Sequence, residues 1–181
     1  MPTWIAFQRA VNVGARKYPM ADLRRVLTEA GYADVETHIQ TGNIRLSAAV
    51  ESREVLEKEL EALFLADRGF EVATIAMAPH ELVQVAADAD EVATDGPPEF
   101  GHYVELLRHE PDAEARAVIE GRELPGQRAV VRGRAVHLLF DIPYHRAKGP
   151  NAAVRRALGD STNRNATVVR ALARKWGAGL S

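Results

Sequence analysis

The chain has 181 residues, of which 46% are hydrophobic and 27% are charged, and its formal net charge at pH 7 is −2. This composition is typical of a folded globular protein, and the slightly acidic balance argues against a dedicated nucleic-acid binder. The absence of cysteine excludes disulfides, thiolate metal sites, iron–sulfur clusters and cysteine nucleophiles.

The first part of the chain alternates strand and helix patterns. Met20, Leu23, Leu27 and Ala30 recur at the spacing of one helix face, and Gly31 suits the residue after a last helical turn. Short apolar runs separated by turn residues predict strands on either side. The predicted strands are residues 4–9, 35–39, 44–46 and 70–77, and the predicted helices are residues 20–30, 51–65 and 79–87.

A second round of the same pattern follows an acidic segment. Residues 88–101 contain Gly96-Pro97-Pro98 and form the best linker candidate. Beyond them we predict a strand at 103–107, a hairpin at 129–140 that turns at Gly133-Arg134, and helices at 111–120, 152–158 and 166–176.

The order of elements predicts an α/β fold of the α+β plait type. Two ferredoxin-like βαββαβ halves would form one compact chain. The first half would be residues 1–95, with an extra helix near 79–87, and the second half residues 96–181, with a C-terminal helix. No residue-level repeat supports the duplication, which rests on element order alone.

Three polar clusters could carry a function: residues 9–14 (RAVNVG), 40–43 (QTGN) and 162–165 (TNRN). Arginines and amides present hydrogen-bonding groups, and glycines let a ligand approach the backbone. The alternative is that these residues only stabilise turns and cap a helix. The candidate ligand-binding residues are Arg9, Asn12, Gln40, Asn43, Arg164 and Asn165.

A fourth cluster is basic and precedes the helix predicted at 152–158. His145, Arg146 and Lys148 make it a secondary anion-site candidate, with a solvated basic loop as the alternative. The chain has neither GxxxxGK[ST] nor GxGxxG, so no nucleotide-binding fingerprint is present.

No catalytic or metal-binding motif appears in the sequence. The six histidines do not form HExxH or another compact ligand spacing, so we expect neither a metal nor a cofactor. His38 is the one candidate base near the second cluster. The strand signature of RNA-recognition motifs is also missing, which makes nucleic acid an unlikely partner.

The polar clusters together resemble a known family. AFQRAVNVG at residues 6–14 resembles that family's ALLRGINVGG, HIQTGN at 38–43 resembles its YIQSGN, and TNRN at 162–165 resembles its TTRNW. Ala10, Thr41 and Ala166 depart from the family's glycine, serine and tryptophan. The family is the bacterial domain of unknown function 1697 family. The resemblance implies a cytosolic protein of two ferredoxin-like halves, and it supplies neither a substrate nor catalytic residues.

Three hypotheses about function remain open. The first is a module that binds a small polar or anionic ligand in a cleft between the halves. The alternatives are an enzyme of unknown reaction that uses the same cleft, and a protein-interaction or structural module. The N-terminus lacks a signal-peptide pattern and the apolar runs have the length of strands, so we expect a cytoplasmic protein with no membrane partner.

Overall fold

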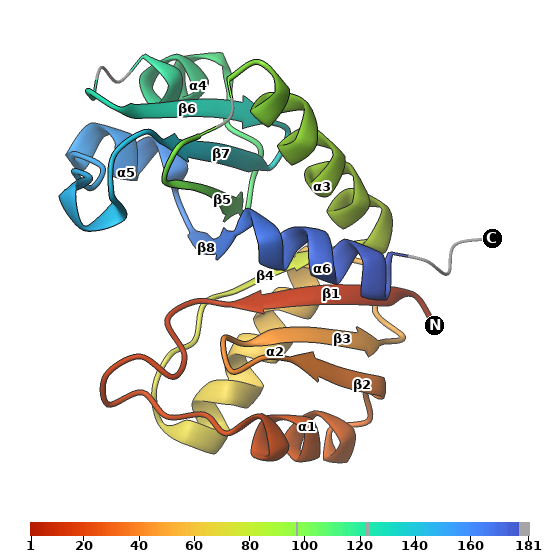
Figure 1. Ribbon diagram of the computed structural model, residues 1–181. Coiled ribbons are helices and arrows are strands. Elements are labelled where there is room, and N and C mark those ends of the chain that lie inside the picture. The colour runs from red at the N-terminus through yellow and green to blue at the C-terminus, as the bar shows by residue number, and fades with distance from the viewer. Residues whose placement is uncertain (97, 122–123, 178–181) are drawn as a thin grey trace. The chain divides into compact units, whose positions relative to one another are not determined.

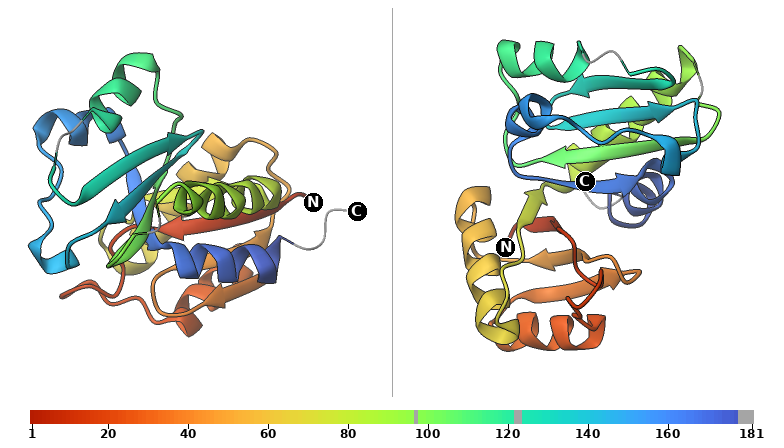
Figure 2. Two further views of the ribbon diagram at one scale, coloured as in Figure 1. Left: turned by 45° about the horizontal axis from the view of Figure 1, so that its top comes forward. Right: turned by 90° about the vertical axis from the view of Figure 1, so that its left-hand side faces the viewer.

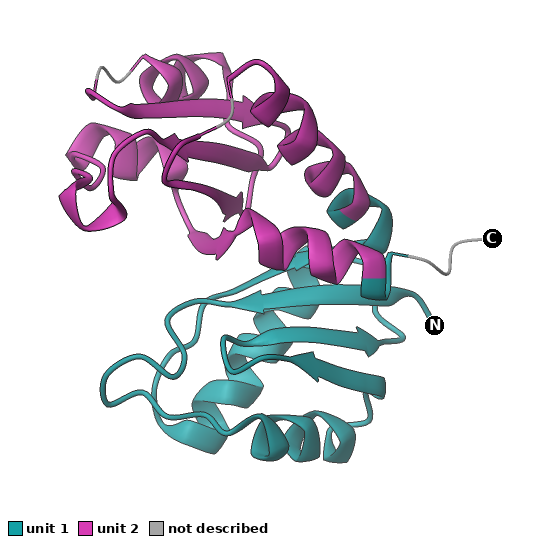
Figure 3. Ribbon diagram, viewed as in Figure 1, with its two compact units in different colours: residues 1–82, 175–181 teal, residues 83–174 magenta. Residues whose placement is uncertain are grey.

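The computed structural model describes residues 1–96, 98–121 and 124–177. The chain divides into two compact units (Figure 3): unit 1 is Met1–Leu82 with Lys175–Ser181, and unit 2 is Val83–Arg174. Each unit carries one four-stranded sheet. The units are described separately below.

Unit 1 has ferredoxin-like topology (Figure 1). Its sheet has the strand order β2-β3-β1-β4, and all neighbouring strands are antiparallel. This is the βαββαβ arrangement predicted from the sequence. Along the chain its elements are β1 (Thr3–Gln8), α1 (Met20–Glu29), β2 (Ala33–His38), β3 (Asn43–Ser47), α2 (Arg53–Arg68) and β4 (Thr74–Met77).

Unit 2 repeats this topology. Its sheet has the order β6-β7-β5-β8, and the four strands follow one another in the right-hand view of Figure 2. The helix α3 (Pro79–Thr94) precedes these strands, so the linker expected at 88–101 is helical as far as Thr94. The other elements are β5 (Gly101–Leu107), α4 (Ala113–Glu120), β6 (Gln127–Arg132), β7 (Ala135–Phe140), η1 (Tyr144–Arg146), α5 (Ala152–Leu158), β8 (Ser161–Asn165) and α6 (Ala166–Trp176).

Short polar side chains begin three of the helices. Ser52, Asp112 and Asn151 each accept a hydrogen bond from the backbone N–H three residues later, at the starts of α2, α4 and α5. Each satisfies one of the N–H groups that lack an intrahelical partner. Gly69 ends α2 in the left-handed conformation.

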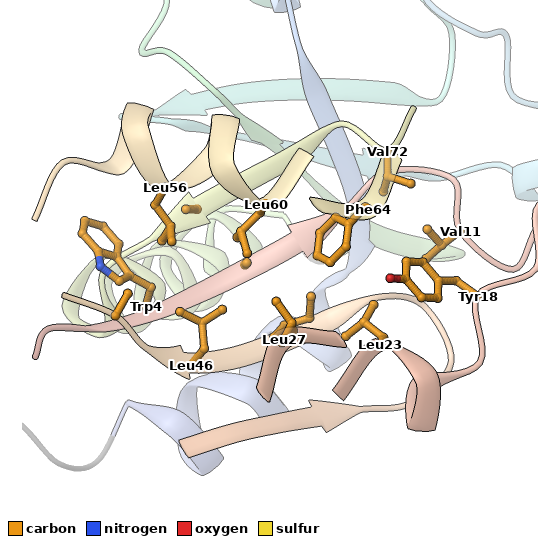
Figure 4. Close-up of a cluster of buried hydrophobic side chains, with 14 of the residues drawn as sticks. Trp4, Val11, Tyr18, Leu23, Leu27, Leu46, Leu56, Leu60, Phe64 and Val72 are labelled. Carbon is orange, nitrogen blue, oxygen red and sulfur yellow. The ribbon is translucent and has the colours of Figure 1, made fainter. Parts of the chain in front are cut away.

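The core of unit 1 lies between its sheet and the helices α1 and α2 (Figure 4). Leu23 of α1 and Leu60 of α2 are both fully buried, as is Leu46 of the sheet. Full burial of such a side chain contributes about 1.5–3 kcal/mol. Tyr18 packs edge-on against Phe64, with ring centroids 5.7 Å apart. The chain leading into α1 is therefore held by the same core.

Carboxylates of helices cover an edge strand in each unit. The buried Glu57 of α2 accepts a hydrogen bond from the backbone N–H of Ala76, and Glu61 accepts one from Thr74. Both donors lie in β4, an edge strand. In unit 2, Glu120 of α4 accepts from the N–H of Val131 in the edge strand β6. Edge amides that could pair with another chain are thus satisfied internally.

The predicted mixed α/β fold with two ferredoxin-like halves is confirmed, as is the hairpin turn at Gly133-Arg134. Besides the longer α3, further elements differ from the prediction. The strand β4 begins at Thr74 rather than near residue 70, and Ser161–Asn165 form the unexpected strand β8. Within the described part of the chain, no helix is both long and apolar enough to cross a membrane.

Candidate functional site

In unit 1, two of the polar clusters meet where the chain leaves β1. The β1–α1 loop (residues 9–19) starts beside the β2–β3 turn (residues 39–42) and the end of the segment that leads into β4. The N–H of Gln8 donates to the carbonyl oxygen of Gly42 at 2.8 Å, and the N–H of Arg9 donates to that of Ala73 at 2.8 Å. These bonds fix the point at which the loop begins.

Asn12 ties the β1–α1 loop to the β2–β3 turn. Its Nδ2 donates to the carbonyl oxygens of Gln40 at 2.7 Å and Tyr18 at 3.0 Å, and its Oδ1 accepts from the N–H of Tyr18 at 2.9 Å. Its φ of 57° lies in the left-handed region, which asparagine tolerates better than most residues. Asn12 and Gln40, two of the candidate ligand-binding residues, are therefore in direct contact, through the amide of the first and the backbone of the second.

Asn43 and Gly42 hold the β2–β3 turn. Asn43 is fully buried, and its Nδ2 donates to the carbonyl oxygen of His38 at 3.0 Å and to Oγ1 of Thr41 at 2.9 Å. Gly42 has a φ of 73°, and a Cβ built on it would lie 2.6 Å from Cβ of Gln8 and 2.7 Å from Cγ2 of Val11. Only glycine fits this approach between the turn and the loop.

Three other side chains of the same two segments point to solvent without a polar partner among the described residues. Arg9, Lys17 and Gln40 are exposed, and none of their side chains makes a hydrogen bond or ion pair with another described residue. Arg16 lies close by and has one donor engaged: its Nη1 donates to the carbonyl oxygen of Glu71 at 3.4 Å. Residues 9–21 contain no carboxylate. The loop thus presents the cations Arg9 and Lys17 with no ion-pair partner among the described residues.

Two further candidates lie in unit 2, on β8. Arg164 is buried, and its Nη1 donates to the carbonyl oxygen of Asn163 at 2.7 Å and to Oγ1 of Thr162 at 3.0 Å. Burial lowers the pKa of Arg164 to about 10, an effect that the charge of Glu105 partly opposes. Oδ1 of Asn165 accepts from the N–H of Thr167 at 2.8 Å, so this side chain caps the start of α6.

The secondary anion-site candidates also lie in unit 2, in and after η1. His145, Arg146 and Lys148 are all exposed. Directly before them, Tyr144 packs against Tyr103 and Phe140 of the sheet. The sequence did not indicate this aromatic neighbourhood, because residues 103, 140 and 144 come together only through the pairing of β5 with β7.

The histidines behave differently in the two units. In unit 1, the ring of His38 packs edge-on against Trp176, with centroids 6.2 Å apart. In unit 2, Nε2 of His102 lies 3.2 Å from Nδ1 of His137, and both rings are buried. Desolvation by burial lowers the pKa of each to about 4. No cluster of three or more metal-ligating side chains occurs among the residues that the structure covers.

Comparison with known proteins bears on the family and the fold. The solved structure of the conserved bacterial protein SP0830 from Streptococcus pneumoniae is similar, with a TM-score of 0.74, 20% sequence identity, and coverage of 95% of this chain and 97% of that one. At this identity the likeness shows the fold alone. No curated protein matches the chain. The model of the family described as protein of unknown function (DUF1697) matches residues 1–137. The chain belongs to this family of proteins of unknown function.

Proposed function

We propose that the β1–α1 loop and the β2–β3 turn of unit 1 bind a small anionic ligand. The observation that supports this most directly is the contrast between two sets of neighbouring side chains. Asn12 and Asn43 are occupied in holding the backbone, whereas Arg9, Lys17 and Gln40 are exposed and have no polar partner among the described residues. A held backbone with unused donors is the arrangement that a binding site requires.

The chemistry of these donors favours carboxylate or phosphate groups. The arginine guanidinium presents parallel N–H groups that match two oxygens of an anion, and the lysine ammonium adds a point charge. The amide of Gln40 can donate to a third oxygen. With no carboxylate between residues 9 and 21, the loop has no internal counter-ion to compete with a ligand.

A thermal-shift series against inorganic phosphate, citrate and chloride tests the proposal. A ligand that binds the folded state raises the apparent Tm by mass action. We expect phosphate or citrate to raise the Tm more than chloride at equal ionic strength, and we expect Arg9→Ala and Lys17→Ala each to reduce the effect. Arg156→Ala and Lys58→Ala are matched controls, because both side chains are exposed and lie on other elements.

The same series tests whether Arg164 and Asn165, the candidates in unit 2, contribute to ligand binding. Arg164→Lys keeps the charge but loses the guanidinium fork, and Asn165→Asp keeps an oxygen that can cap α6. Loss of the ligand-induced shift in either variant would assign that residue to the ligand set. Equal shifts in wild type, Arg9→Ala and Lys17→Ala would refute the proposal.

A further inference from the structure

Three aromatic rings gather in unit 2, outside the loop and turn described above. The ring of Phe140 on β7 packs edge-on against Tyr103 on β5, with centroids 5.8 Å apart, and against Tyr144 of η1 at 5.5 Å. Tyr103 and Tyr144 lie 4.8 Å apart, with their planes tilted by 38°. Aromatic pairs at these separations attract each other beyond simple burial, so each ring holds the others in place.

The rings form a layered stack that ends in solvent. Phe140 is buried, Tyr103 is half-buried, and Tyr144 is 58% exposed. Tyr103 lies close over Gly101, where an added Cβ would come within 3.1 Å of its ring. The missing side chain at Gly101 lets that ring lie against the strand. The outermost ring, Tyr144, is therefore a supported aromatic surface rather than an isolated exposed side chain.

Cationic side chains follow this surface directly. His145 and Arg146 share η1 with Tyr144, and Lys148 lies two residues beyond. All three are exposed, and their side chains make no hydrogen bond or ion pair with other residues of the described ranges. Residues 142–159 contain no carboxylate, and Oδ1 of the preceding Asp141 accepts from the N–H of Glu99.

We propose that this surface binds a free nucleoside 5′-monophosphate. The base stacks on the outer face of Tyr144, and Arg146 and Lys148 bind the phosphate. A planar ring joined to an anion is the ligand class that matches an exposed aromatic surface followed by cations, because every nucleobase offers a π-face and phosphate pairs with arginine and lysine. The site lies in unit 2 and does not depend on the function proposed for unit 1.

A single nucleotide fits better than a nucleic-acid strand. Proteins that track single strands present successive aromatic surfaces along a positively charged groove. Of the three stacked rings, Tyr144 alone is largely exposed, and the chain has a net charge of −2. A strand would gain little from bases beyond the first.

Isothermal titration calorimetry of the full chain with AMP, adenosine and inorganic phosphate tests the proposal. We expect AMP to bind at least tenfold more tightly than either fragment. Tyr144→Leu should weaken AMP binding by about 5- to 150-fold, the range found when a stacking aromatic is removed. Tyr144→Trp keeps a stacking ring and should bind AMP as well as wild type. Phe100→Leu is the matched control, because Phe100 is an exposed aromatic outside the stack.

A double substitution tests the binding of the phosphate separately from the binding of the base. Arg146→Ala with Lys148→Ala should weaken AMP at least tenfold and leave adenosine unchanged, while Arg9→Ala should leave AMP unchanged at this site. The proposal is overturned if the Arg9→Ala variant binds AMP no better than phosphate, or if Tyr144→Leu binds AMP like wild type. It is also overturned if affinity for single-stranded oligonucleotides rises steadily with their length.

Discussion

At the scale of single residues, Gly42 sets how closely the β2–β3 turn approaches β1. We predict that Gly42→Ala lowers the free energy of unfolding by about 2–4 kcal/mol, because a left-handed φ is combined with a clash against Gln8 and Val11. Gly14→Ala is the control. Gly14 has a similar φ of 59°, but nothing lies within 4 Å of the added Cβ. Its substitution should therefore lower the free energy of unfolding by only about 1–2 kcal/mol. Urea denaturation measures both, and equal losses would contradict the steric explanation.

Asn12 gives a second prediction at this scale. In Asn12→Gly the glycine tolerates the left-handed φ, but three hydrogen bonds of the side chain are removed. We expect the free energy of unfolding to fall by about 1–3 kcal/mol because of those lost bonds. Amide hydrogen exchange gives the local readout. The N–H of Tyr18, which donates to Asn12, should exchange faster in the variant than in wild type. Unchanged protection of Tyr18 would show that the loop does not depend on this side chain.

At the scale of elements, the edge strand β4 depends on carboxylates of α2. We predict that Glu57→Ala destabilises the protein by about 1–3 kcal/mol, because the buried N–H of Ala76 loses its acceptor. Lys58→Ala, an exposed change on the same helix, should cost less than about 0.5 kcal/mol. Light scattering gives a second readout, because an uncovered edge can pair with another chain. Equal stabilities of the two variants would contradict this role.

The elements that the sequence predicts well are those with apolar periodicity. The helix α1 and the hairpin at Gly133-Arg134 follow from spacing and turn chemistry. The strand β8 does not, because its sequence STNRN has no apolar alternation. Its pairing instead uses polar side chains: Ser161 and Asn163 both donate to the carboxylate of Glu105, at 2.5 and 2.9 Å. That partner lies more than fifty residues earlier and cannot be read from a local pattern.

Only part of the candidate site could be predicted from the sequence. Composition singled out Arg9, Asn12 and Gln40 as polar groups, and nothing in it separates side chains that hold the backbone from those left exposed. The contact of Asn12 with the backbone of Gln40 spans 28 residues. The pair His102 and His137 was missed for a related reason, since it arises only from the register of β5 on β7.

At the scale of the whole molecule, this histidine pair links stability to pH. An unfolded histidine has a pKa near 6.5. In the folded chain, burial lowers the pKa of both rings to about 4, and the charge of Arg170 is the second cause for His102. As the pH falls below 6.5 the unfolded chain takes up protons that the folded chain does not. The contribution is therefore complete above pH 6.5 and is lost between pH 6.5 and 4, by at most about 1.4 kcal/mol per pH unit for each proton.

Urea denaturation at pH 7, 6 and 5 measures this dependence. The double substitution of His102 and His137 by leucine removes both imidazoles together and should leave a shallower decline, which separates the pair from titrating carboxylates. Hydrogen exchange of β5 and β7 amides places the effect in unit 2. Charged groups that act on the pair are Asp90 of α3, Arg170 of α6, and Arg128 and Arg132 of β6. Parallel declines in wild type and double variant would contradict the prediction.

The central claim, an anion site on the β1–α1 loop and the β2–β3 turn, is tested most directly by an NMR titration. The ¹⁵N-labelled protein is titrated with inorganic phosphate at constant ionic strength, and the backbone amide shifts are followed residue by residue. We predict that the saturable shifts within unit 1 are confined to residues 9–17 and 40–42 and are lost in Arg9→Ala, whereas shifts at residues 144–148 persist in that variant. Shifts spread evenly over exposed arginines of both units, or no shift at residues 9–17, would contradict the claim.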